Sequence, residues 1–161
     1  MPELPKESPC HDHVIGLLEQ RIDQLYRDGK AIVDRYWKVI YAMENKLPGW
    51  ESKCRLQIRC IVKGNSIRAD WTEVKWYGSS SKGDRNSIRR QIIKPKGSYG
   101  YTLSKLKTLA PEWAKEIVEE TETQLVGVRR EASHLVKAIM YIKHARTAFS
   151  EDISVEAGDV P

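Results

Sequence analysis

Cysteine is scarce in this chain, with three residues among 161. An odd and sparse set of cysteines argues against a framework of disulfide bonds and favours a reducing compartment. Residues 1–8 contain no apolar core of a secretory signal, and the longest apolar run is far too short to cross a bilayer. These absences exclude a disulfide-rich secreted scaffold and a membrane protein, and they predict a cytoplasmic protein.

Sequence motifs for catalysis are absent as well. The chain contains no Gly-rich phosphate loop, nucleophile elbow or paired catalytic carboxylates. Residues 10–13 (Cys-His-Asp-His) are the one cluster of metal-type ligands, but a closed zinc site needs four ligands and Asp12 is more simply a helix N-cap. We therefore predict no metal, no cofactor and no enzymatic activity. A small nuclease built on Asp70, Glu73 and Asp84 is the catalytic alternative.

Basic charge is concentrated in the middle of the sequence. Residues 51–110 contain 14 Lys and Arg against 4 Asp and Glu, a local net charge of +10. Residues 1–50 carry 7 basic and 8 acidic groups, and residues 111–161 carry 6 and 10. A basic β-segment interleaved with aromatic residues is typical of nucleic-acid binding, whereas a solvated basic sheet face is the alternative.

Apolar periodicity predicts two long helices. From Ile15 to Met43, and again from Ala114 to Ile142, mostly apolar positions recur at spacings of three or four residues. Gly29 lies in the first of these stripes, where it either allows a close helix crossing or marks a weak point. We expect a flexible leader over residues 1–10, helices ending near residue 46 and spanning 111–147, and a disordered acidic tail over residues 148–161.

Alternation of apolar and polar residues predicts three strands between these helices. Residues 54–63 form the clearest strand, and Gly64-Asn65 is a turn. A change of apolar phase after Trp71 predicts a β-bulge near residues 72–73. The third strand, at about residues 86–94, has a poorly fixed register. The predicted fold class is α+β, a long helix, a three-stranded antiparallel meander and a long helix, in a single domain over residues 11–147.

The segment Lys94-Pro-Lys-Gly-Ser-Tyr-Gly-Tyr101 is the sharpest local feature. Its glycines allow backbone amides to approach a phosphate, its lysines supply charge and its tyrosines supply stacking faces. The alternative is a connection whose tyrosines fold over the core. The candidate DNA-contact residues share a basic or aromatic side chain on an outward strand position or in an adjoining loop, and they are Arg55, Arg59, Arg68, Trp76, Arg85, Arg89, Arg90, Lys94, Lys96, Tyr99 and Tyr101.

The central segment also resembles a known family. The pattern comprises Trp71, Trp76-Tyr77, Gly83, Ile88-Arg89-Arg90, Lys94 and Gly97–Tyr101, followed by Trp113 and a long acidic-then-basic helix. It resembles the MobI family of small mobilisation proteins of integrative and conjugative elements. The resemblance implies an auxiliary factor that binds DNA at the origin of transfer and helps the relaxase, and it implies no catalytic residues.

Taken together, these features predict a DNA-binding accessory protein of conjugative transfer. Its partners are double-stranded DNA and, through the resemblance, a relaxase. The two apolar stripes exceed what one small sheet can cover, which predicts a homodimer formed through the helices. A DNA-binding transcriptional regulator and a helical protein–protein adaptor are the alternative functions.

Overall fold

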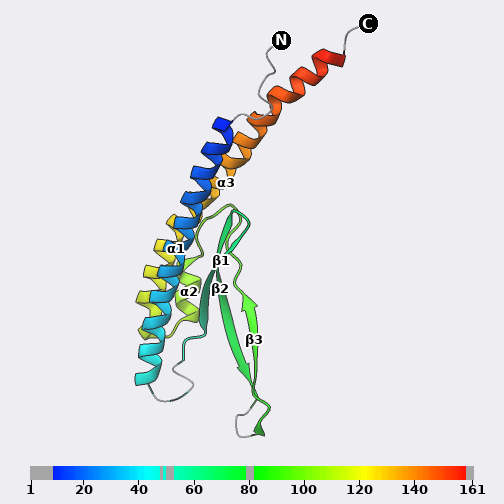
Figure 1. The fold of residues 1–161 in the computed structure, drawn as a ribbon. Coiled ribbons are helices and arrows are strands. Elements are labelled where there is room, and N and C mark those ends of the chain that lie inside the picture. Colours follow the sequence, from blue (N-terminus) through cyan, green and yellow to red (C-terminus); the bar gives the residue numbers. More distant parts are fainter. Residues whose placement is uncertain (1–8, 48, 50–52, 79–81, 159–161) are drawn as a thin grey trace.

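A computed structural model describes residues 9–47, 49, 53–78 and 82–158. The elements in chain order are α1 (Pro9–Lys46), β1 (Leu56–Lys63), β2 (Ser66–Tyr77), β3 (Asn86–Gln91), α2 (Leu103–Leu109), a 3-10 turn (Glu112–Ala114) and α3 (Lys115–Gly158). A long helix, a three-stranded antiparallel sheet and a second long helix confirm the predicted fold class (Figure 1). None of the helices in the described part of the chain is long and apolar enough to span a membrane.

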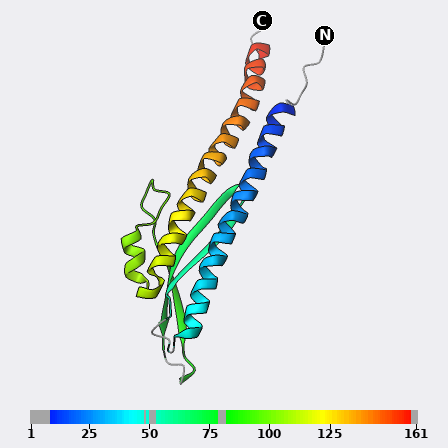
Figure 2. The ribbon, with the colours of Figure 1, turned by 90° about the vertical axis from the view of Figure 1, so that its left-hand side faces the viewer.

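The two long helices run antiparallel, side by side, and the sheet packs against them (Figures 1 and 2). Apolar side chains from α1, α3 and one face of the sheet form a single buried core. Exposed ion pairs cross between the helices along their length, and they are Asp12–Arg146, Arg21–Glu131 and Arg35–Glu120. Such surface pairs contribute little free energy individually, so apolar packing holds the helices together.

The sheet has the strand order β1-β2-β3 and an uninterrupted register. β1 pairs with β2 from Leu56↔Glu73 to Lys63↔Ser66, and β2 pairs with β3 from Thr72↔Gln91 to Tyr77↔Asn86. The predicted bulge near residues 72–73 is therefore wrong. Trp71 and Val74 are both buried, but they lie on opposite faces of a regular strand.

Alternation along the strands gives the sheet two faces. The inner face packs on α1 and α3 and includes Leu56, Ile58 and Trp71. We call the opposite side the outer face, and its residues are Gln57, Arg59, Ile61 and Lys63 of β1, Ser66, Arg68, Asp70, Thr72, Val74 and Trp76 of β2, and Ser87, Arg89 and Gln91 of β3. Paired residues in an antiparallel sheet point to the same side, so this set follows from the register.

Residues of α1 position that helix against the edge of β1. The Tyr36 hydroxyl donates to the Leu56 carbonyl over 2.8 Å, and Trp37 Nε1–H donates to the Ile58 carbonyl over 3.0 Å. These side chains satisfy backbone acceptors that an open sheet edge would otherwise present to another chain. A Cβ on Gly29 would lie 2.9 Å from Cys60 Sγ, so this glycine allows the close approach of the helix.

The structure corrects three helix predictions. α2 was not predicted, because seven residues are too few to display a helical period. Pro111 precedes a 3-10 turn, and the second long helix begins after that turn at Lys115. α3 then continues to Gly158, beyond the predicted end at residue 147, so part of the predicted disordered tail is helical. Residues 1–8 of the predicted leader and residues 159–161 lie outside the described residues.

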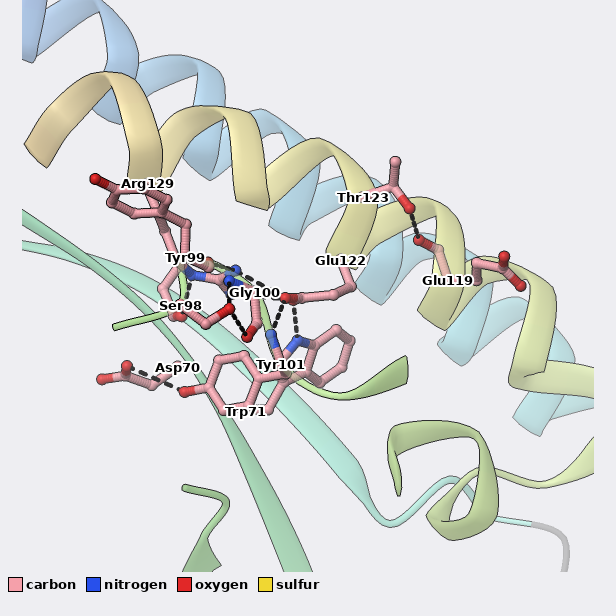
Figure 3. A network of polar contacts seen from close by, with 11 residues as sticks. Asp70, Trp71, Ser98, Tyr99, Gly100, Tyr101, Glu119, Glu122, Thr123 and Arg129 are labelled. Atoms are coloured by element: carbon pink, nitrogen blue, oxygen red, sulfur yellow. Dashed lines mark hydrogen bonds and ion pairs between the residues drawn. The ribbon is translucent and has the colours of Figure 1, made fainter. Parts of the chain in front are cut away.

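A buried ion pair within α3 connects this helix to the sheet and to the segment before α2. The side chains of Glu122 and Arg129 are 1% and 6% exposed, and Arg129 Nη1 lies 2.9 Å from Glu122 Oε1. Glu122 also accepts a hydrogen bond from Trp71 Nε1–H over 2.7 Å and one from the Tyr101 backbone N–H over 2.7 Å (Figure 3). Arg129 donates to the Ala69 carbonyl over 3.0 Å. One pair therefore fixes β2, residues 99–101 and α3 relative to each other.

Replacing Glu122 with Gln should strongly destabilise the fold. The substitution keeps the side-chain shape but leaves Arg129 as an uncompensated buried charge, which costs about 3–5 kcal/mol. Chemical denaturation followed by circular dichroism measures the loss. The matched control is Glu131→Gln, which removes the same charge from the exposed Arg21–Glu131 pair and should have a much smaller effect. Equal losses in the two variants would contradict this role of the buried pair.

Candidate nucleic-acid interface

The register of the sheet brings three arginines from three different strands onto the outer face. Arg59 of β1 pairs with Asp70 of β2, and Arg68 of β2 pairs with Ile61 of β1. Arg89 of β3 pairs with Val74 of β2. All three arginines are exposed, and no carboxylate of the described residues lies within ion-pairing distance of Arg59 or Arg89. The positive charge of this face is therefore available to an anionic ligand.

A shallow depression of about 430 Å³, which we call the sheet hollow, lies among these arginines. Its lining residues come from all three strands and from α1, and they are Trp37, Gln57, Ile58, Arg59, Arg68, Asp70, Thr72, Arg89 and Gln91. Apart from Trp37 and Ile58, the lining consists of side chains that form hydrogen bonds or carry charge. Such a surface can offer hydrogen-bond donors from Arg and both donors and acceptors from Gln and Thr.

Asp70 is the acidic residue of the sheet hollow, and two contacts position it. Its Oδ2 lies 3.0 Å from Arg68 Nη2, and its Oδ1 accepts from the Tyr101 hydroxyl over 3.4 Å. Burial, followed by the nearby Asp70 carboxylate, raises the pKa of Tyr101, so the phenol stays protonated and can donate this bond. Through Tyr101, the outer face is connected to the buried Glu122 of α3.

A second depression of about 570 Å³, which we call the edge hollow, adjoins the first and shares Arg68 and Asp70 with it. It lies where β3 has ended at Gln91, so residues 66–70 of β2 have no third strand beside them. Its other lining residues come from three places: β2, the segment that follows β3, and α3. They are Ser66, Ile67, Ala69, Lys94, Gly97, Ser98, Tyr99, Arg129, Ala132, Ser133, Val136 and Lys137. Lysines and hydroxyl groups together suit a phosphate group.

The described residues contain no group of three His, Cys, Asp or Glu side chains that could hold a metal ion. The Cys54 and Cys60 thiols also lack a reactive environment. Burial raises the pKa of the Cys54 and Cys60 thiols, which keeps them protonated and weakly nucleophilic.

Comparison with known proteins identifies the family. A family model described as MobI protein matches residues 25–143, well over half of the chain. The chain belongs to the MobI family. The match confirms the resemblance found in the sequence, and it makes the chain a mobilisation-related accessory protein. No curated protein and no solved structure matches the chain.

The MobI match includes every residue of both hollows, and it also includes all the candidate residues predicted from the sequence. The structure brings Arg59, Arg68 and Arg89 together in the sheet hollow, and Lys94 joins Arg68 in the edge hollow. Arg55 is exposed directly before β1, with its carbonyl accepting from the Val74 N–H over 2.8 Å. Five of the predicted basic residues therefore lie on or beside the outer face, and they are Arg55, Arg59, Arg68, Arg89 and Lys94.

Of the remaining candidates, Tyr99 also lines the edge hollow, whereas the others do not. Lys96 is exposed but does not line the edge hollow, and Arg90 lies on the other face of β3, opposite Glu73. Tyr99 is half-buried with the Arg130 guanidinium 5.6 Å from its ring centroid. Tyr101 is only 8% exposed and belongs to the buried core, as the alternative of a tyrosine folded over the core predicted, so little of its ring is accessible to DNA.

Trp76 and Arg85 form a separate pair at the far end of the sheet. The Arg85 guanidinium lies 5.1 Å from the centroid of the Trp76 ring, and both side chains are exposed. They do not line either hollow.

Sequence reasoning missed several residues of this surface. Gln57, Thr72 and Gln91 alternate in phase with the arginines, and that phase was the signal that could have identified them. Lys137 belongs to the second long helix, and nothing in the sequence predicts that it lies beside the segment that contains Lys94.

Proposed function

We propose that this MobI protein binds double-stranded DNA at the origin of transfer through the outer face of its sheet, in the cytoplasm, and helps to load the relaxase. The observation that carries the proposal is the gathering of Arg59, Arg68 and Arg89 in one hollow with Gln and Thr side chains. The origin of transfer and the relaxase rest on family membership. The helices cover the inner face, so the outer face is the side of the sheet that is open to DNA.

The dimensions of the sheet suit the major groove. Neighbouring strands lie about 4.8 Å apart, so arginines from three adjacent strands span roughly 10 Å of backbone. The major groove is about 12 Å wide and admits a two-stranded β-ribbon, so two neighbouring strands can enter it while an arginine of the third strand reaches its rim. Its base edges also match the side chains present, because Arg recognises guanine, Gln recognises adenine and the Thr methyl group contacts thymine.

The edge hollow supplies contacts to the DNA backbone. Lys94, Lys137 and the hydroxyl groups of Ser66, Ser98 and Ser133 lie beside Arg68, which belongs to both hollows. Phosphate contacts of this kind fix the position of a protein on DNA but carry no sequence information. The outer face therefore reads bases while its neighbouring edge positions the duplex.

Binding of duplex DNA should depend steeply on salt and on the three arginines of the sheet hollow. If the surface neutralises six to ten phosphates, affinity should fall by about 10³–10⁵ between about 50 and 200 mM salt. The triple change Arg59→Gln, Arg68→Gln, Arg89→Gln should remove specific binding while leaving the fold unchanged, because these side chains are exposed. Fluorescence anisotropy with a labelled duplex measures both effects.

The matched control carries the same loss of charge on α1, at three exposed positions, as Arg27→Gln, Lys38→Gln, Lys46→Gln. It should keep most of the affinity of the original protein. Equal losses in the two triple variants would show that net charge, rather than the outer face, determines binding. Absence of binding at low salt would refute DNA binding altogether.

Single changes should separate base recognition from backbone anchoring. Arg89→Ala should relax sequence preference by about 1–3 kcal/mol, because Arg89 lies on the base-reading face. Lys94→Ala with Lys96→Ala should weaken binding to all sequences about equally and lower the salt slope by roughly 2. Competition between target and random duplexes tests both statements. A uniform loss in Arg89→Ala would make that residue a phosphate contact, and unchanged binding in the lysine variant would make the loop structural.

We also propose that the protein is a homodimer formed through its helices. The ends of α1 and α3 extend together beyond the sheet (Figure 1), and Val14, Leu17, Met140 and Tyr141 are exposed on this part. A second copy would bury these side chains, which is favourable in proportion to the apolar area removed from water. A symmetric dimer would also match a repeated or palindromic DNA site.

Light scattering at micromolar concentration should give twice the chain mass of 18.5 kDa. The double change Leu17→Glu, Tyr141→Glu should give monomers, because it places charge in the apolar contact. The control Ile93→Glu alters a more exposed apolar residue outside the helices and should leave the dimer intact. A monomeric mass for the original protein would contradict the proposal.

A further inference from the structure

The hairpin formed by β2 and β3 extends beyond the rest of the fold. β1 reaches only as far as Leu56↔Glu73 and the Val74–Arg55 hydrogen bond, so residues 75–77 of β2 have β3 as their only neighbouring strand. Every residue of β3 is exposed. Figures 1 and 2 both show this hairpin continuing past the end of α1. Its outer part is thus a two-stranded ribbon with both faces uncovered.

This ribbon exposes large apolar side chains on both of its faces. Trp76 on the outer face is 46% exposed, while Tyr77 and Ile88 on the other face are 51% and 56% exposed. The described core does not require them, since none belongs to the buried cluster. Exposed aromatic residues grouped on a projecting ribbon mark a contact with a ligand.

The charge around these side chains identifies the chemistry of the ligand. Residues 75–90 contain five Lys and Arg and one Asp, a net charge of +4. The Arg85 guanidinium lies 5.1 Å from the Trp76 ring centroid, so a flat cation and a flat aromatic ring lie together. These features favour an anionic partner with flat faces, and unpaired nucleic-acid bases on a phosphate backbone meet both conditions.

The backbone holds this arrangement in place. Gly78 has φ of 80°, and a Cβ at that position would lie 2.5 Å from the Asp84 carbonyl oxygen. Only glycine allows this close approach without strain, and Asp84, which Gly78 approaches, directly precedes Arg85.

We propose that the hairpin, through Trp76, Tyr77 and Arg85, stacks on unpaired bases of locally opened DNA. Base faces are inaccessible inside a paired duplex, whereas the outer face of the sheet reads only base edges. The protein would then hold a duplex on its sheet and an adjacent melted segment on its hairpin. This inference rests on the proposed function, because it assigns a form of DNA to the far end of the same sheet.

The test compares two labelled DNAs of one sequence, a fully paired duplex and the same duplex with a central stretch of mismatched bases. The original protein should bind the mismatched DNA about tenfold more tightly, which is the contribution of roughly one stacked base. Trp76→Ala and Tyr77→Ala should each reduce this preference, while Trp76→Phe should retain most of it. Tyr41→Ala removes a similarly exposed tyrosine from α1 and should leave the preference for mismatched DNA unchanged.

The outcomes separate this inference from the proposed function. Tight binding to paired duplex without preference for mismatched DNA would overturn the inference and leave duplex binding in place. An equal loss on both DNAs in Trp76→Ala would also overturn it, because the hairpin would then be a duplex contact. Failure to bind either DNA would overturn the proposed function and the inference together.

Discussion

The buried pair of Glu122 and Arg129 is the interaction on which the rest of this structure depends. Its two side chains bind the Trp71 indole, the Ala69 carbonyl and the backbone around residues 99–101, so α3 holds the sheet and the following segment at once. Two buried charges are costly unless each forms several hydrogen bonds, and here each does. Because Tyr101 also reaches Asp70, this pair sets the geometry of the outer face as well.

The sheet separates two tasks through strict alternation. Its inner face gives the helices an apolar surface, and its outer face gathers arginine, glutamine and threonine side chains from three strands. Because β3 ends at Gln91, residues 66–70 of β2 have no strand on that side, and lysines from the next segment and from α3 can approach the same surface. The end of β3 at Gln91 thus produces the edge hollow, and the start of β1 at Leu56 leaves the projecting hairpin.

Periodicity predicted much of this from the sequence. The two helices, the strand order and the outward phase of Arg59, Arg68 and Arg89 follow from local alternation. Alternation gave a wrong prediction at Val74. This residue is buried on the outer face, away from the core, and its apolar side chain therefore looked like the phase change that a bulge produces. Long-range contacts were also out of reach: nothing local predicts that Tyr101 is buried or that Glu122, among many exposed glutamates, pairs with Arg129. The residues that the strands contribute to the two hollows were therefore predictable from the sequence, whereas those contributed by the segment after β3 and by α3 were not.

The central claim is that the outer face of the sheet is the surface that contacts duplex DNA. Nuclear magnetic resonance of the arginine Nε–Hε groups during addition of duplex tests it most directly. The account predicts changes in the signals of Arg59, Arg68 and Arg89, and little change for Arg27 and Arg35 of α1. Changes confined to the arginines of α1, with none on the sheet, would contradict it.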